Sequence, residues 1–282
     1  MPCFIIRYNL VIYVKDGIDM KTNHKISALY LALTALCGFV LSVQRAGAET
    51  NGLSMMIVAA AAAVVLTLCG LGVESLRKKL LLKPAAPDKL GFAMLMLSGL
   101  FFVLAAVLFL LQSGAPGLLN TVTALFCGFC GAATLLRLPL RDSGKMAAIY
   151  SLIPIFFVSF FLLMFYRSNG DNPYLYQFGY EVALLLAVLL GIYAAVAGRF
   201  EKARPRFRSV ACSIGLCFLA QEAVSVLMIP QMVLSIPGFS VATVVMLAGC
   251  GMLLCHGMFY PSVREVFPEP EESDEPEETE ES

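Results

Sequence analysis

A carboxylic acid side chain stands in the middle of an apolar stretch. The stretch "SIGLCFLAQEAVSVLMIP" runs from Ser213 to Pro230 and carries Gln221 and Glu222 at its centre. A charge near the bilayer centre costs roughly 2.5–3.5 kcal/mol on insertion scales, so such residues face the interior of a helix bundle and find partners there. In a helix, Ser225 lies one turn beyond Gln221 and Glu222, so the three side chains can border one side. They form either a ligand or proton site or a neutral, hydrogen-bonded tie between helices, worth about 0.6 kcal/mol per bond.

A second polar stretch, "YRSNGDNPYLYQFGYE", contains Arg167 and Glu181. The loops predicted on the same side, "SGAPG" and "PQMVLSIPG", carry no charge. Glu181 would lie about two turns into the helix that follows, at an outer depth similar to that of Glu222. The candidate site for a small solute or a proton is therefore an outward-facing polar pocket formed by Arg167, Glu181, Gln221, Glu222 and Ser225.

The composition indicates which class of protein must position these residues. Of the 282 residues, 59% are hydrophobic and 14% are charged, and the mean hydropathy is +0.80. Soluble domains have roughly 45–50% apolar and about 25% charged residues. The chain therefore belongs with membrane proteins, and its principal partner is the lipid bilayer.

Eight apolar stretches have the length of about 20 residues that a spanning helix needs. They predict an all-α, polytopic membrane helix bundle with eight transmembrane helices arranged as four hairpins, with an internal hairpin repeat of about 60 residues. Small residues cluster in the even-numbered helices, so we expect those helices to pack centrally. The predicted spans are 26–44, 53–73, 90–112, 118–136, 146–166, 180–198, 209–229 and 239–260.

Lysine and arginine fall almost entirely on one side of this topology. The N-terminal segment, the three even-to-odd connections and the tail hold four, five, three, five and one basic residues, 18 in all, against Arg45 and Arg167 on the other side. Basic loops stay in the cytoplasm. We therefore predict a protein of the bacterial inner membrane with both termini cytoplasmic.

The two ends of the chain are expected to lie outside the bundle of residues 26–260. Residues 1–25 form a cytoplasmic segment, of which 1–19 are interpreted as an upstream extension preceding a native start at Met20. A second interpretation is a signal peptide ending near Ala48, although the apolar core is longer than is usual for one. Residues 261–282 read as a disordered acidic tail, since ten of the twenty acidic residues follow Arg264.

Other chemistry finds little support in the sequence. The nine cysteines are scattered, the only histidines are His24 and His256, and buried cysteine usually acts as a small apolar residue. His256 is expected to be a packing residue. Catalytic motifs are absent. We therefore expect no enzyme activity, no metal, no cofactor and no nucleic-acid partner.

Two functions remain open at this point. One is a small-solute transporter or binder that uses the outward-facing pocket. The other is a non-catalytic membrane subunit or scaffold that acts through protein partners at the basic cytoplasmic loops.

The charge distribution makes a testable prediction about orientation. Reporter fusions after Lys83 and Arg204 should report a cytoplasmic location, and fusions near Gly114 and Gly170 should report the outside, because basic loops resist translocation. A cytoplasmic signal at Gly170 would contradict the predicted orientation.

Overall fold

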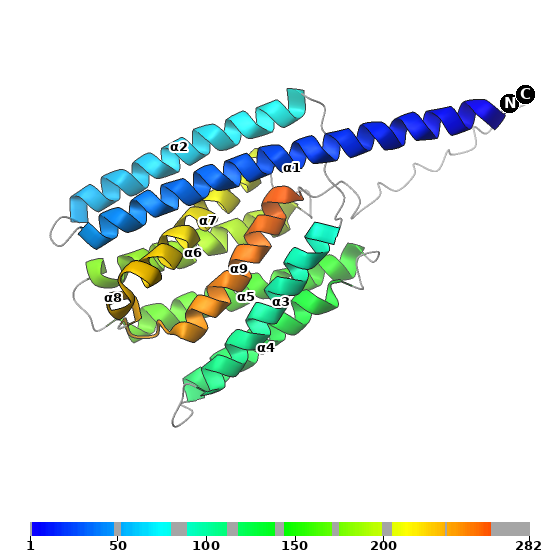
Figure 1. Ribbon diagram of the computed structural model, residues 1–282. Helices are drawn as coiled ribbons and strands as arrows, with labels where there is room; N and C mark the ends of the chain where they lie inside the picture. Colours follow the sequence, from blue (N-terminus) through cyan, green and yellow to red (C-terminus); the bar gives the residue numbers. More distant parts are fainter. Residues whose placement is uncertain are drawn as a thin grey trace, which may run out of the picture.

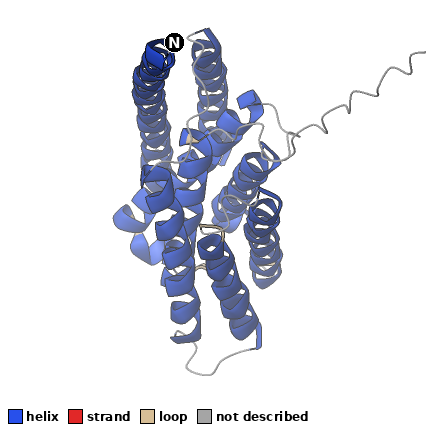
Figure 2. Cartoon of the chain, turned by 90° about the vertical axis from the view of Figure 1, so that its right-hand side faces the viewer, coloured by secondary structure: helices blue, strands red, loops and turns tan. Residues whose placement is uncertain are grey.

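The computed structural model describes residues 2–47, 52–79, 89–111, 118–138, 144–170, 175–198, 205–234 and 236–260. Within these ranges the chain consists of helices and short turns and contains no strand (Figure 2). The prediction of an all-α bundle is confirmed. The predicted acidic tail, 261–282, lies outside the described residues.

Among the described residues, eight long helices correspond to the eight apolar stretches, and a ninth, short helix lies in the connection that precedes the last of them. The first helix begins at Pro2 and is continuous to Gly47. That residues 1–25 form a cytoplasmic segment stays a prediction. The hairpin repeat stays a prediction. The helices are α1 (Pro2–Gly47), α2 (Gly52–Lys79), α3 (Lys89–Leu111), α4 (Leu118–Leu136), α5 (Gly144–Ser168), α6 (Leu175–Ala197), α7 (Pro205–Met228), α8 (Pro230–Leu234) and α9 (Val241–Phe259).

Seven of these helices are long and apolar enough to cross a membrane: α1, α2, α3, α5, α6, α7 and α9. The eighth, α4, is apolar over the shorter range Asn120–Leu136. At 1.5 Å per residue its full 19 residues rise about 28 Å, close to the hydrocarbon thickness of about 30 Å. The helices fit a multi-pass membrane protein.

Helix α7 packs against α1, α2, α6, α8 and α9, and so lies at the centre of one half of the bundle. Helices α3 and α4 pack together, and α9 joins them to α7 (Figure 1). In the most apolar stretch of each helix, 61% of residues are buried in α6 and in α9, but only 17% are buried in α2. The expectation that all even-numbered helices are central is therefore wrong for the second and the fourth. Among the described residues, α2 packs extensively against α1 and α7, and α4 packs extensively against α3 and α5.

Small residues set the spacing between α6 and α7. A Cβ atom added to Gly191 would lie 3.1 Å from the carbonyl oxygen of Ala211, and one added to Gly215 would lie 3.1 Å from that of Ala187. Each helix thus presents two small residues four apart, which allow the backbones to approach closely.

Helix α1 runs parallel to α7. Tyr30 and Ser213 are joined through their hydroxyl groups at 2.7 Å, and Ser42 and Ser225 are joined in the same way at 3.1 Å. From the first bonded pair to the second, the residue number increases on both helices. The two helices therefore end on the same side of the bundle, as expected for the first and seventh spans.

The backbones of α1 and α7 approach each other closely at Gly38. A Cβ atom at this position would lie 2.5 Å from the carbonyl oxygen of Cys217 and 2.7 Å from the Cβ of Ala220. Both distances are below van der Waals contact, and a backbone oxygen cannot rotate away. Any side chain larger than hydrogen would push α1 from α7.

Replacement of Gly38 should therefore destabilise the bundle. We expect Gly38→Ala to lower the free energy of unfolding by about 1–3 kcal/mol, the usual cost of overpacking, measured by thermal unfolding in detergent. The matched control is Gly72→Ala on α2, where an added Cβ meets no atom within 4 Å. Alanine should stabilise that helix by about 0.5–1 kcal/mol. Equal effects at the two glycines would contradict the close α1–α7 contact.

Candidate functional site

Three charged side chains from three helices meet inside the bundle. The guanidinium of Arg45, on α1, donates through Nη1 to Oε2 of Glu222 on α7 at 2.9 Å, and through Nη2 to Oε1 of Glu181 on α6. The relative exposures of the three residues are 4%, 2% and 0%. We call this group the charged triad. One arginine thus uses the two ends of its planar fork to bridge two carboxylates.

Polar and aromatic neighbours surround the triad. The Arg45 guanidinium carbon lies 4.8 Å from the ring centroid of Tyr180, a geometry in which the face of the ring attracts the cation. The bonded hydroxyls of Ser42 and Ser225 lie one turn from Arg45 along α1 and one turn from Glu222 along α7. Ser225 therefore binds the neighbouring helix directly.

The position of each charged residue follows from where its helix ends. Glu181 lies six residues after the start of α6 at Leu175, and Glu222 lies six residues before the end of α7 at Met228. Six residues rise about 9 Å. Helix α6 connects in sequence to the antiparallel α7, so the two carboxylates reach the same depth. Arg45 lies two residues from the end of α1 and reaches them with its long side chain.

The triad has more acceptors than donors, and it is not fully satisfied. Ionised, two carboxylates and one guanidinium carry a formal charge of −1. Oε2 of Glu181 and Oε1 of Glu222 have no hydrogen-bond partner among the described residues, and neither do Arg45 Nε and the Tyr180 hydroxyl. Buried groups of this kind usually find a partner. The arrangement can therefore accept a proton or a positively charged group.

Gln221 is a further unsatisfied group next to the triad in sequence. The residue is fully buried, and neither its amide nitrogen nor its amide oxygen has a partner among the described residues. Its backbone lies at the close contact with α1, 2.9 Å from the position of a Cβ on Gly38. Gln221 thus lies at the α1–α7 contact and directly precedes Glu222 in α7.

Of the five residues singled out in the sequence, four lie in this region and one does not. Glu181, Gln221, Glu222 and Ser225 are buried, but Arg167 is exposed in the last turn of α5. The cation that contacts both carboxylates is Arg45, which the sequence interpretation placed in an outer loop because the first helix was predicted to end at residue 44.

A signal for Arg45 was nevertheless present in the sequence. Gly38, Ser42 and Arg45 follow one another at spacings of four and three residues, so they share one helical face. That face is the one that meets α7. Extension of the first helix by one turn, to Gly47, is enough to place Arg45 on it.

Other polar clusters act as ties between helices. The Tyr30 hydroxyl donates to the carbonyl of Leu66 on α2 and is bonded to Ser213 on α7, which joins three helices. Ser98 donates to the carbonyl of Gly249 at 2.8 Å and joins α3 to α9.

The cysteines and His256 also have packing roles. The thiols of Cys127 and Cys212 donate to backbone carbonyls of neighbouring helices, and all described cysteines are unpaired. His256 packs on Tyr260 with ring centroids 5.2 Å apart. The described residues contain no group of three or more histidine, cysteine, aspartate or glutamate side chains that could hold a metal ion.

Comparison of the chain with protein-family models, curated proteins and solved structures finds no match. The interpretation of the charged triad therefore depends on its own geometry and chemistry.

The triad predicts non-additive effects of charge removal. Arg45→Gln leaves two carboxylates buried without a cation and should cost about 3–5 kcal/mol of stability, as for other broken buried ion pairs. Adding Glu181→Gln and Glu222→Gln to Arg45→Gln removes the stranded charges and should restore a large part of that loss. Thermal unfolding of the wild type, Arg45→Gln, the variant with Glu181→Gln and Glu222→Gln, and the variant with all three changes measures the coupling. Simple additivity of the losses would contradict direct contact between these side chains.

Proposed function

We propose that this protein is a small-solute carrier or binder whose charged triad binds a proton or a small cation. In this proposal it is not an enzyme, it lies in the bacterial inner membrane with both termini cytoplasmic, and the triad is near the outer side. The observation that carries the proposal is the bridging of two buried carboxylates by a single guanidinium.

The charge count explains why this observation points to a cation. A single Arg–Glu pair is neutral and suffices to tie two helices together. The second carboxylate leaves one uncompensated negative charge in a medium of low dielectric constant, where the energetic cost is high. Binding of one proton or one monovalent cation neutralises the triad. Two carboxylates that share one site titrate as a unit, which suits a site that loads and unloads a single positive charge.

The position of the triad also supports a carrier. Its three members come from α1, α6 and α7, which are separate spans. A change in the charge of the triad therefore alters the forces that hold three helices together. Coupling between ion binding and helix packing is what a carrier needs in order to change its conformation.

A membrane subunit or scaffold that acts through protein partners is the second candidate. The pairing of Arg45 with Glu181 and Glu222 favours this candidate, because a purely structural tie between helices would be paired in the same way. This candidate also accounts for the basic loops predicted to lie in the cytoplasm. The two candidates differ in what happens when one carboxylate is neutralised.

Glu222→Gln separates the candidates. The variant leaves Arg45 and Glu181 as a neutral pair, so we expect its thermal stability to equal or exceed that of the wild type. In proteoliposomes on a solid-supported membrane, rapid jumps in pH, sodium or methylammonium concentration should displace charge in the wild type. Glu222→Gln should lose this current.

The control for this experiment is Glu74→Gln on α2, whose carboxylate accepts a hydrogen bond from Ser209 on α7, away from the triad. This variant should retain the current. If the wild type shows no charge displacement with any of the three cations, the carrier proposal fails and the scaffold candidate takes its place.

A further inference from the structure

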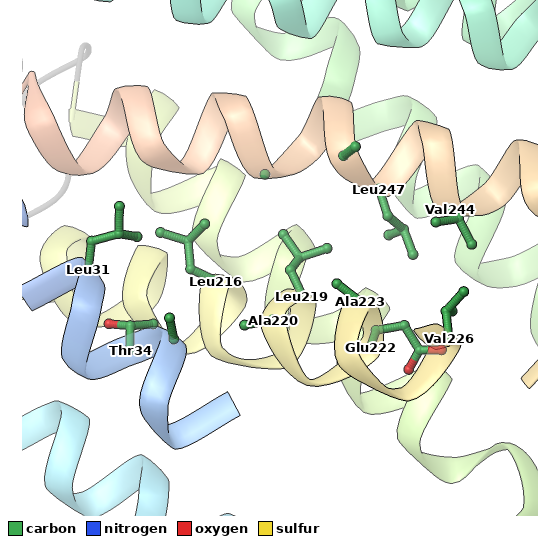
Figure 3. Close-up of a pocket in the computed structure, with 13 residues that line it drawn as sticks. Leu31, Thr34, Leu216, Leu219, Ala220, Glu222, Ala223, Val226, Val244 and Leu247 are labelled. Atoms are coloured by element: carbon green, nitrogen blue, oxygen red, sulfur yellow. The ribbon is translucent and has the colours of Figure 1, made fainter. Parts of the chain in front are cut away.

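An apolar groove of about 290 Å³ lies beside the charged triad, between α1, α7 and α9 (Figure 3). Both α1 and α9 pack on α7 but have little contact with each other, which leaves the groove between them. Its walls are formed mainly by branched aliphatic side chains from the three helices, among them Leu31, Leu216, Leu219, Val226, Val244 and Leu247.

The groove opens sideways toward the hydrocarbon of the bilayer. Ala35, Ala223 and Ala248 line it, one from each of the three helices, and all three are exposed. All three also lie within spans long and apolar enough to cross the membrane. Small side chains at the mouth leave it wide enough for a molecule to enter from the lipid phase.

One end of the groove carries a carboxylate that belongs to the triad. Figure 3 shows Glu222 beside Val226 at one end, while Leu31 and Leu216 lie at the other. Oε2 of Glu222 accepts a hydrogen bond from Arg45, whereas Oε1 has no partner among the described residues. The Thr34 hydroxyl, also in the groove, already donates a hydrogen bond to the carbonyl oxygen of Tyr30 at 2.8 Å. Glu222 therefore supplies an acceptor that is buried and has no partner among the described residues.

We propose that this groove binds an amphipathic amine that enters from the bilayer, with its alkyl chain along the groove and its ammonium group at Glu222. The inference rests on the proposed function and names the class of cation. The ammonium neutralises the formal charge of −1 on the triad and donates to Oε1 of Glu222. A volume near the lower end of small-molecule sites, about 300–1,000 Å³, fits one short chain.

The alkyl chain and the ammonium have different roles in this proposal. Lipid tails are as apolar as the leucines of the groove, so transfer of the chain from bilayer to groove contributes little affinity. The chain instead concentrates the amine in the membrane and brings it to the opening. Charge provides the selectivity, because an alcohol cannot neutralise the triad and a carboxylate is repelled by it.

The probe for the test is radiolabelled decylamine, with protein in phosphatidylcholine nanodiscs and binding to protein-free nanodiscs subtracted. We expect saturable binding that unlabelled decylamine abolishes and that equal concentrations of decanol or decanoate leave intact. Glu222→Gln should weaken binding at least tenfold. Ala223→Leu, which fills the groove from an exposed position, should do the same, and its thermal unfolding verifies that it is folded.

The matched control is Ala60→Leu on the exposed face of α2, outside the groove, which should bind decylamine like the wild type. Equal competition by decanol, unchanged binding in Ala223→Leu, or no binding beyond that of protein-free nanodiscs would each overturn the amine proposal. Suppression of binding by phosphatidylethanolamine in the nanodiscs would instead assign the groove to the ammonium of a lipid headgroup, and would also overturn it.

Failure of this inference is distinguishable from failure of the proposed function. If the wild type displaces charge on a pH jump but does not bind decylamine, the triad is a cation site and the groove is not part of it. If Glu222→Gln keeps the charge displacement of the wild type, the proposed function itself is wrong, whatever decylamine does.

Discussion

An unpaired charge is costly in hydrocarbon, and the α1–α6–α7 half of this bundle is organised around that constraint. Glu181 and Glu222 are buried on neighbouring antiparallel helices, and a guanidinium from a third helix lies between them. Removal of the guanidinium would leave two carboxylates that repel each other in a medium with little screening. The position of α1 relative to α6 and α7 is therefore fixed by electrostatics as well as by packing.

Close packing makes this electrostatic arrangement possible. The absence of a side chain at Gly38 lets α1 contact the backbone of α7 at Cys217, and Gly191 and Gly215 do the same for α6 and α7. The side chain of Arg45 can span from α1 to both carboxylates only because the three helices approach so closely. Small residues and charged residues thus depend on one another in this half of the bundle.

The helices were largely predictable from the sequence, because a spanning helix needs a long apolar stretch and each stretch is visible by itself. The predicted span 118–136 coincides with α4, and the burial of Glu181, Gln221 and Glu222 follows from the cost of placing them in lipid. A local sequence pattern does not indicate which helices pack against one another. Helix α2 is as apolar as its neighbours, so its position at the edge depends on contacts made elsewhere in the chain.

Arg45 was not predicted as the cation of the triad, because a local sequence pattern does not show which distant helices pack together. Arg167 is near Glu181 in the sequence, whereas Arg45 is separated from Glu181 by 136 residues and from Glu222 by 177. Proximity along the chain favoured Arg167, which lies exposed in the last turn of α5. The parallel packing of α1 on α7, which brings Arg45 to both carboxylates, is a property of the folded bundle.

That separation has a consequence for biosynthesis. At about 5–20 residues per second, a ribosome adds Glu222 roughly 10–35 s after Arg45. Glu181 is added 136 residues after Arg45, so for most of that interval the arginine has neither of its partners. Because Arg45 lies two residues from the helix end, its side chain can extend to the aqueous interface while it waits. The second ion pair, with Glu222, thus closes late in assembly, when the seventh helix arrives.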